Sequence, residues 1–412
     1  MQAQATGKSG ARGRARRWLW VLGPGLMVML ADTDAGSLIT AAQSGAEWHY
    51  RMILPQLLLI PVLYMVQEIT VRLGIVTGKG HGELIRQHFG PLWAYLSSAT
   101  LLLSSVGGLV TEFVGIAATG GLFGIPPVVT VGAAALFLIG IGITGSYRRV
   151  ERVGLMLGLF ELIFVVVAVW AHPDWAVIGR DALKIPLANR RFLLMLSANI
   201  GAVIMPWMIF YQQGAVLDKG WGGRPEHLQA ARWDTWAGSA VTQVIMVSMV
   251  VATAATIGSH GSSTLTTVSQ IAGVLSPYTG HWVGTLLFGM GMLGASLIAA
   301  LVISIAGSWG LGEVMGFRHS LNHRLTEAPW FYGLYAAVFI MGALVVLCVQ
   351  NLVSLAIDVE VMNALLLPIV LGFLLLLEAR ALPAEHRMQG AHRYGVWALS
   401  AVVMVFGFAV VL

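Results

Sequence analysis

Long apolar runs, each about the length that crosses a lipid bilayer as a helix, recur along the whole chain. Short polar segments separate these runs. The pattern predicts eleven membrane-spanning helices, over residues 20–45, 52–76, 91–118, 128–145, 151–172, 192–216, 234–258, 281–312, 331–350, 353–378 and 393–412. The ninth and tenth spans are the hardest to separate, because the run VVLCVQNLVSLAIDVEVMNALLLP contains no clear loop. Strand-like alternation is absent, so we expect an all-α polytopic membrane protein.

Composition supports a membrane protein and argues against a soluble one. The 412 residues are 57% hydrophobic and 10% charged, with a mean hydropathy of +0.79, whereas a soluble domain of this length needs far more surface charge. A single cysteine excludes an internal disulfide and a cysteine-rich metal site. The net charge of +5 could suggest nucleic acid, but its placement fits membrane topology, so we expect no nucleic-acid partner.

The distribution of Lys and Arg predicts an orientation in the cytoplasmic (inner) membrane. With the N-terminus inside, 19 of the 24 Lys and Arg residues lie on the cytoplasmic side. Residues 1–19 are then a basic cytoplasmic tail that contains the segment ARGRARR. The apolar run after it is too long for a signal peptide and contains acids, so we interpret it as a retained first helix. An odd number of spans places the C-terminus outside.

Two spans carry interruptions at corresponding positions. The first span contains DTDAGS over residues 32–37, and the sixth contains NIGAVIMPW over residues 199–207, five spans later. Secondary transporters are often built from two inverted halves with broken helices at matching places. The sequence therefore predicts one transport domain over residues 20–412, with repeats at about 20–172 and 192–378 and an extra helix at 393–412.

The interruption in the first span brings a carboxylate and a hydroxyl to one face. Asp34 and Ser37 are three residues apart, and Gly36 is expected to loosen the helix between them. Asp32 lies about 200° around the helix from Asp34, so the two acids are not expected to serve one site unless the backbone unwinds. A local cap or pair is one explanation for Asp32, and its role is left open. A carboxylate within the membrane is costly and is a functional candidate for that reason.

The interruption in the sixth span adds a carbonyl and a sulfur atom. Pro206 has no N–H, so the carbonyl of Ala202 lacks its helical partner, and Met205 lies on the same face. Proline kinks and methionine packing are the alternative explanation. Together the two interruptions offer donors for a divalent cation near the bilayer midplane. Oxygen atoms alone suit Mg²⁺ or Ca²⁺, whereas a thioether favours Mn²⁺ and Fe²⁺.

These motifs resemble the NRAMP family of divalent metal transporters. Gly23 to Ser37 has the frame Gly-Pro-Gly, eight residues, then Asp-Ala-Gly-Ser, similar to a family signature that usually ends in Asp-Pro-Gly-Asn. GAVIMP, residues 201–206, resembles the family's Ala-x-x-Met-Pro. The segments QEITVRLGIVTGKGHGEL (67–84) and TEFVGIAATGGLFGIP (111–126) are similar to its second and third helices. The resemblance is weak after about residue 315.

The resemblance implies a LeuT-like fold of two inverted five-helix repeats, with helices 1 and 6 broken, plus one extra helix. It also implies import of Mn²⁺ or Fe²⁺ by alternating access with protons as the coupled ion. Asp34 would be the metal's carboxylate, Ala202 would supply its carbonyl and Met205 its sulfur. Glu112 would match the third-helix glutamate of the family's proton route.

Departures from the family pattern concern the proton route more than the metal site. Ser37 replaces the family Asn, Ala35 replaces Pro, and Trp207 replaces the histidine after Met-Pro. The next family histidine falls at Gln212 or Gln213, and Leu109 stands in place of an acid. Relatives that lack the sixth-helix Met are regarded as magnesium transporters. Because Met205 is present, Mn²⁺ or Fe²⁺ is favoured and Mg²⁺ is the alternative, with proton coupling open.

Several further residues carry expectations of their own. Trp207 is expected to line or plug the inner path, with ordinary packing as the alternative. Arg72 is a candidate partner for Glu112. Asp358 and Glu360 are expected to be solvated acids in the loop between the ninth and tenth spans.

Other classes of function are less consistent with the sequence. A sodium-coupled carrier of small anionic solutes is disfavoured by Asp34. We find no Ser–His–Asp set, HExxH motif or paired acids at membrane depth, so no enzyme activity is expected. The expected partners are the lipid bilayer, a divalent metal ion and, as an open question, protons. We expect a monomer with no permanently bound cofactor.

Overall fold

The computed structural model describes residues 23–258, 264–273, 280–348 and 352–408, so the predicted tail at 1–19 lies outside the described part. All regular elements within these residues are helices. They are α2 (Pro24–Asp32), α3 (Ala35–Trp48), η1 (His49–Met52), α4 (Ile53–Thr77), α5 (His81–Phe89), α6 (Pro91–Leu122), α7 (Pro127–Gly142), α8 (Tyr147–Gly158), η2 (Leu159–Leu162), α9 (Ile163–Trp170), α10 (Trp175–Asp181), α11 (Arg190–Val203), α12 (Pro206–Asp218), η3 (Pro225–His227), α13 (Leu228–Thr256), α14 (Val268–Ala272), α16 (His281–Met315), α17 (Pro329–Cys348), α18 (Leu352–Ala381), η6 (Ala384–His386) and α19 (Gly390–Phe408).

The helices follow the apolar runs of the sequence. Among the described residues, eight helical stretches are long and apolar enough to cross a membrane, and α7 is a shorter apolar helix. One of the eight, Ala35–Thr77, joins α3, η1 and α4 without a break. Every predicted span overlaps one to three consecutive helices, which agrees with the all-α membrane architecture. The exact number of crossings stays a prediction.

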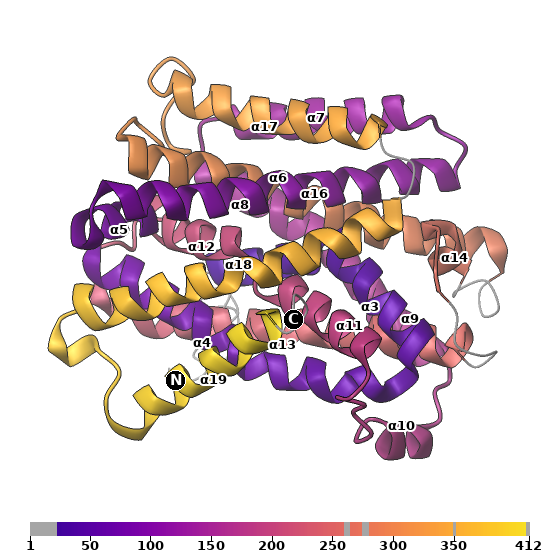
Figure 1. Ribbon diagram of the computed structural model, residues 1–412. Coiled ribbons are helices and arrows are strands. Elements are labelled where there is room, and N and C mark those ends of the chain that lie inside the picture. Colours follow the sequence, from indigo (N-terminus) through magenta and orange to yellow (C-terminus); the bar gives the residue numbers. More distant parts are fainter. Residues whose placement is uncertain (1–22, 259–263, 274–279, 349–351, 409–412) are drawn as a thin grey trace, which may run out of the picture.

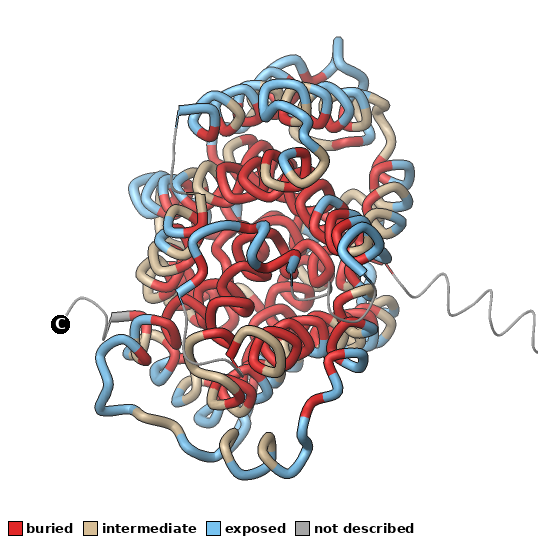
Figure 2. Tube along the Cα trace, turned by 90° about the vertical axis from the view of Figure 1, so that its right-hand side faces the viewer, coloured by how far each residue is buried: buried red, intermediate tan, exposed pale blue. Residues whose placement is uncertain are grey.

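The broken helices lie inside the bundle. In Figure 1, α7 and α17 lie side by side as an outer layer over α6 and α16. Helices α2, α3, α11 and α12 are packed between α13, α16 and α18. Figure 2 shows the consequence, because buried residues fill the centre of the bundle and exposed residues surround it. The interrupted segments are therefore shielded by other helices.

The start of α2 is fixed by an acid from α13. The carboxylate of Asp234 accepts hydrogen bonds from the backbone N–H groups of Gly23 (3.0 Å), Gly25 (2.7 Å) and Leu26 (3.1 Å). These N–H groups belong to the first turn, which has no partners within the helix. A methyl group on Gly25 would lie 2.8 Å from the backbone of Thr235, so this glycine permits the close approach of α13.

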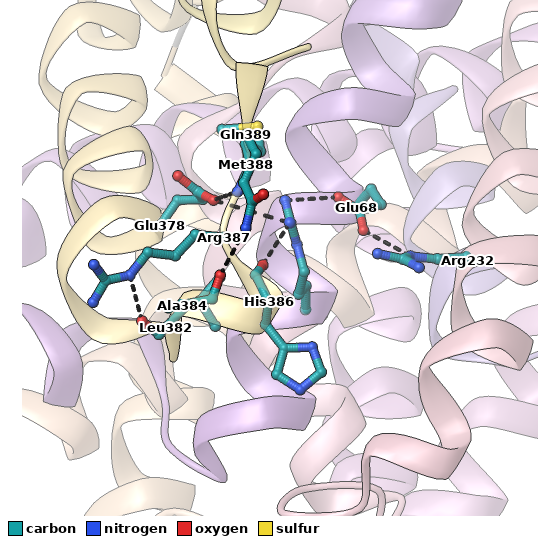
Figure 3. A network of polar contacts seen from close by, with 10 residues as sticks. Glu68, Arg232, Glu378, Leu382, Ala384, His386, Arg387, Met388 and Gln389 are labelled. Atoms are coloured by element: carbon teal, nitrogen blue, oxygen red, sulfur yellow. Dashed lines mark hydrogen bonds and ion pairs between the residues drawn. The ribbon is translucent and has the colours of Figure 1, made fainter. Parts of the chain in front are cut away.

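A buried ion-pair network joins α4, α13 and α18 (Figure 3). Arg72 lies 3.1 Å from Glu68 and 3.9 Å from Glu378, and it donates to the carbonyl of His386 at 2.8 Å. Glu68 also accepts from Arg232 at 2.8 Å. Arg72 is thus held by acids on its own helix and on α18. The expected pairing of Arg72 with Glu112 is wrong.

Candidate functional site

The first interruption falls at Thr33 and Asp34, between α2 and α3. Asp34 is the N-cap of α3, and its Oδ1 accepts the backbone N–H of Ser37 at 2.7 Å. This capping bond explains why the chain re-enters a helix at Ala35. Gly36 lies within the first turn of α3, so the expectation that Gly36 forms the break is corrected. Its lack of a side chain instead leaves space for the carboxylate of Glu360.

The second interruption falls at Ile204 and Met205, between α11 and α12. Both residues have extended backbone angles, and Pro206 is the first residue of α12. Proline suits that position because its missing N–H is not needed there. It also leaves the carbonyl of Ala202 without a helical donor, as the sequence predicts.

A direct hydrogen bond connects the two interruptions. The hydroxyl of Ser37 donates to the carbonyl oxygen of Ala202 at 2.8 Å. The two residues are far apart in the sequence, so this bond brings the two broken spans to one point. Asp34, Ser37, Ala202 and Met205 all have an exposed fraction of 0%, so the point is closed to solvent from both sides.

The candidate ligand atoms at this point differ in whether a hydrogen-bond partner already occupies them. Asp34 Oδ2 is buried and has no hydrogen-bond partner. The sulfur of Met205 accepts the indole N–H of Trp207 at 3.2 Å. Trp207 is fully buried and lies against this sulfur, which places it beside the candidate ligands. The free carboxylate oxygen of Asp34 is the atom best prepared to receive a cation.

Glu112 of α6 faces the start of α3. Its Oε2 accepts the backbone N–H of Ala35 at 3.2 Å, and its Oε1 lies 3.3 Å from the hydroxyl of Thr111. Glu112 is fully buried and immediately next to the residue that caps α3. The predicted proton-route residue is therefore adjacent to the candidate metal site, although its role stays a prediction.

Glu360 of α18 also faces the first interruption, and the expectation of a solvated loop acid is wrong for it. Its side chain is fully buried, with Oε2 accepting from Asn363 at 3.1 Å and Oε1 without a partner. A methyl group on Gly36 would lie 2.2 Å from Oε1, so the glycine lets the carboxylate take this position. The backbone carbonyl of Glu360 likewise lies against Gly201 of α11. Asp358, two residues away, is exposed, but it lies within α18 and not in a loop.

Two further acids lie on the other side of the first interruption. Asp32 ends α2, and both of its carboxylate oxygens are buried without a partner, so a local cap or pair is not formed. Glu161 lies in η2, where its Oε2 forms a hydrogen bond with the hydroxyl of Thr33 and its Oε1 has no partner. Sequence reasoning missed Glu161. The signal that could have found it is a lone carboxylate inside the fifth apolar run.

The positions that align with family histidines form polar contacts instead. Gln212 donates to the hydroxyl of Thr235 at 2.9 Å, and Gln213 donates to the carbonyl of Lys79 at 2.8 Å. Gln213 also lies 3.2 Å from Nδ1 of His81, at the start of α5. Burial lowers the pKa of His81 to about 4. This histidine is therefore neutral near pH 7 and holds α5 to α12.

The donor atoms of the candidate site are few and of mixed type. Among the residues that the structure describes, no group of three or more His, Cys, Asp or Glu side chains is placed to hold a metal ion. Asp34, Ser37, Ala202 and Met205 offer one carboxylate, one hydroxyl, one carbonyl and one thioether. These are ligand types that divalent ions accept, with the thioether suited to transition metals.

Comparison with known sequences identifies relatives over most of the chain. Residues 25–412 match the family model described as Natural resistance-associated macrophage protein-like (NRAMP). A relative from Klebsiella pneumoniae subsp. pneumoniae, named divalent metal cation transporter MntH, is 24% identical over 340 residues, which are 80% of this chain and 81% of that protein. The protein of the same name from Klebsiella pneumoniae strain 342 is 24% identical over 74% of this chain and 75% of its own length.

Comparison with solved structures identifies the same fold. The manganese transporter of Eremococcus coleocola, in complex with an aromatic bis-isothiourea compound, matches with a TM-score of 0.78 at 18% identity, covering 98% of this chain and 88% of that one. A Na⁺-coupled sialic acid symporter in its outward-open state matches with a TM-score of 0.59 at 14% identity, covering 94% and 88%. The fold is thus shared with transporters of different substrates.

Proposed function

The chain belongs to the NRAMP family, and we propose that it imports divalent metal ions across the membrane by alternating access between the two sides. The family is one of membrane transporters and not of enzymes. The LeuT-like fold, shared with the manganese transporter and the symporter, is one that carries its substrate between broken helices. The relatives named as divalent metal cation transporters support the class of substrate.

The observation that carries the proposal is the meeting of the two interruptions at Asp34 and Ala202. Ser37 donates to the carbonyl of Ala202 at 2.8 Å, while Asp34 keeps one carboxylate oxygen free beside it. A divalent cation at this point would take the free oxygen of Asp34 and compete with the Ser37 hydroxyl for the Ala202 carbonyl. The sulfur of Met205 would complete the donor set on the side of α12.

We propose Mn²⁺ or Fe²⁺ as the transported ion, with Mg²⁺ as the alternative. The thioether of Met205 supports the first choice, because soft donors favour transition metals over hard ions. Glu360 supports the alternative, since its free carboxylate oxygen faces the same interruption and would add a second hard, charged ligand. The preference then depends on how far the indole of Trp207 keeps the sulfur of Met205 engaged.

We further propose that the protein lies in the cytoplasmic membrane as a monomer with its N-terminus inside. The support is the bias of 19 among 24 Lys and Arg residues toward one side. The two halves, at about 20–172 and 192–378, would move relative to each other and open the buried site to each side in turn. Glu112, next to Ala35, is the proposed start of any proton route.

Uptake of Mn²⁺ into vesicles that contain the purified protein tests this function. The proposal expects uptake by the wild type and its loss in Asp34→Asn, which keeps the size of the capping side chain but removes its charge. Asp181→Asn is the matched control, because Asp181 is an acid outside the spans, paired with Lys184 at 2.7 Å. Equal uptake by the wild type and Asp34→Asn would refute the site, and no uptake by the wild type would refute the function.

A further inference from the structure

The fifth span is itself interrupted where it meets the first. It runs from α8 through the tight turn η2 to α9, and Glu161 lies in that turn. Two glycines bring α8 close to α2: a methyl group on Gly154 would lie 2.5 Å from Met27, and one on Gly158 would lie 2.8 Å from Leu30. The same packing continues one turn further, where Glu161 meets Thr33. Small residues on one helix commonly permit such an approach in membrane proteins.

The hydrogen bonds around Thr33 leave room for one additional proton. The hydroxyl of Thr33 lies 2.9 Å from the carbonyl oxygen of Leu30 and also contacts Oε2 of Glu161. A hydroxyl has one proton and accepts through its lone pairs. Both contacts are satisfied together when Glu161 is protonated and donates to Thr33, while Thr33 donates to Leu30. When Glu161 is ionised, the hydroxyl of Thr33 turns to the carboxylate.

The surroundings of Glu161 offer an ionised carboxylate little support. Among the described ion pairs, none includes Glu161, and its Oε1 is buried without a partner. The charged groups whose fields reach it are the acids Asp32 and Asp34. Helices α8, α9 and α16 pack against η2, and their other titratable groups lie near the helix ends, away from Glu161. These groups are Tyr147, Arg148, Arg149, Glu151 and Arg152 at the start of α8 and His281 and Glu313 near the ends of α16, whereas α9 has none.

Two of the other buried acids at the interruption differ from Glu161 in this respect. The hydroxyl of Thr111 beside Glu112 donates to the carbonyl of Gly108, but Glu112 also accepts the backbone N–H of Ala35, and Glu360 accepts the amide of Asn363. Donors of this kind support a charged carboxylate. For Glu161, the single contact is a hydroxyl whose proton has another acceptor. Asp32 also lacks a donor, but neither of its oxygens has a hydrogen-bond partner, whereas a proton on Glu161 would complete the chain of hydrogen bonds from Glu161 through Thr33 to Leu30.

We propose that Glu161 holds a proton in the metal-free protein and releases it to solution when a divalent cation binds at Asp34. This inference rests on the proposed function. The arriving cation brings two positive charges next to Thr33, so an ionised Glu161 becomes favourable and the O–H bond of its carboxylic acid breaks. The hydroxyl of Thr33 then donates to the new carboxylate. Metal binding and proton release are coupled through a residue of the fifth span.

Titration calorimetry with Mn²⁺ in buffers of different ionisation enthalpy tests this coupling. The full chain in detergent is titrated at one pH, and the dependence of the heat on the buffer gives the number of protons released per ion. We expect Glu161→Gln to bind Mn²⁺ and release one proton fewer than the wild type. Release of one proton makes the affinity for Mn²⁺ change roughly tenfold per pH unit, and Glu161→Gln should lose this part of the pH dependence. Asp181→Asn, an exposed acid whose pKa is held below its usual range by Lys184, should match the wild type.

The outcomes separate this inference from the proposed function. An unchanged proton count in Glu161→Gln would overturn the inference and leave the transport function intact. Failure of the wild type to bind Mn²⁺ would overturn both. Should the amide of Glu161→Gln disturb the fold, as judged by size-exclusion chromatography, Glu161→Met removes the carboxyl at similar length and must give the same reduced count. A reduced count in Glu360→Gln, with Glu161→Gln unchanged, would assign the proton to α18 instead.

Discussion

Ser37 in the first broken span donates a 2.8 Å hydrogen bond to the carbonyl of Ala202 in the sixth. Residues with 164 others between them in the chain thus form one buried contact at the centre of the bundle. Each partner exists because its helix is interrupted: Asp34 caps α3 so that Ser37 lies in its first turn, and Pro206 frees the carbonyl of Ala202. This bond is the link between the two halves that the account of transport requires.

Removing the Ser37 hydroxyl should weaken metal binding modestly. Ser37→Ala removes one oxygen donor from the ion. The loss is partly offset, because the carbonyl of Ala202 is left buried without its donor in the metal-free protein, at a cost of about 1–3 kcal/mol. Ser37→Asn, which restores the usual residue of the family signature, should bind Mn²⁺ more tightly than the wild type because the amide oxygen reaches further. The apparent KM for Mn²⁺ uptake measures both. The same KM for all three proteins would show that residue 37 is not a ligand.

The sulfur of Met205 should determine selectivity. Met205→Ala should narrow the preference for Mn²⁺ over Mg²⁺, because only the transition metal gains from a thioether. Met208→Ala is the matched control, since Met208 is an equally buried methionine of α12 and its truncation should cost a similar 2–5 kcal/mol of stability. Competition between the two ions in uptake gives the ratio. A ratio that changes equally in both variants would argue against ligation by sulfur.

Gly36 and Glu360 should be coupled through their close contact. Gly36→Ala places a methyl group 2.2 Å from Oε1 of Glu360, so the buried carboxylate must shift from its position, at a cost of about 1–3 kcal/mol. Shortening the acid should relieve the clash. We therefore expect the melting temperature of the double variant Gly36→Ala/Glu360→Ala to exceed the value expected from adding the two single effects. Simple additivity would contradict the contact.

The protein should lose stability on acidification through His81. Burial lowers the pKa of His81 to about 4 in the folded protein, whereas the unfolded chain binds a proton near the ordinary value of 6.5. Stability is therefore full above pH 6.5 and falls between pH 6.5 and 4, by up to about 3 kcal/mol. His81→Gln should flatten the dependence of the melting temperature on pH in this window. His88→Gln, a less buried histidine of the same helix, should not flatten it.

The sequence predicts the fold and half of the site because both depend on local patterns. Apolar runs of bilayer length placed the spans, and Asp34 and Pro206 marked the two interruptions. Glu360 was misplaced because the run around residues 349–351, which lie outside the described residues, gives no signal for where α18 begins. Glu161 was missed because its importance comes from the packing of Gly154 and Gly158 on α2. Contacts between helices that are distant in the sequence cannot be predicted from the residues of one apolar run.

The most direct test of the central claim is the position of Mn²⁺ in crystals of the protein grown with the ion, located by its anomalous scattering. The account predicts a peak between the first and sixth spans, in contact with Asp34 Oδ2, the carbonyl of Ala202 and the sulfur of Met205. It also predicts that crystals of Asp34→Asn lack this peak. A peak elsewhere in the molecule, or an unchanged peak in Asp34→Asn, would contradict the assignment of these residues as the transport site.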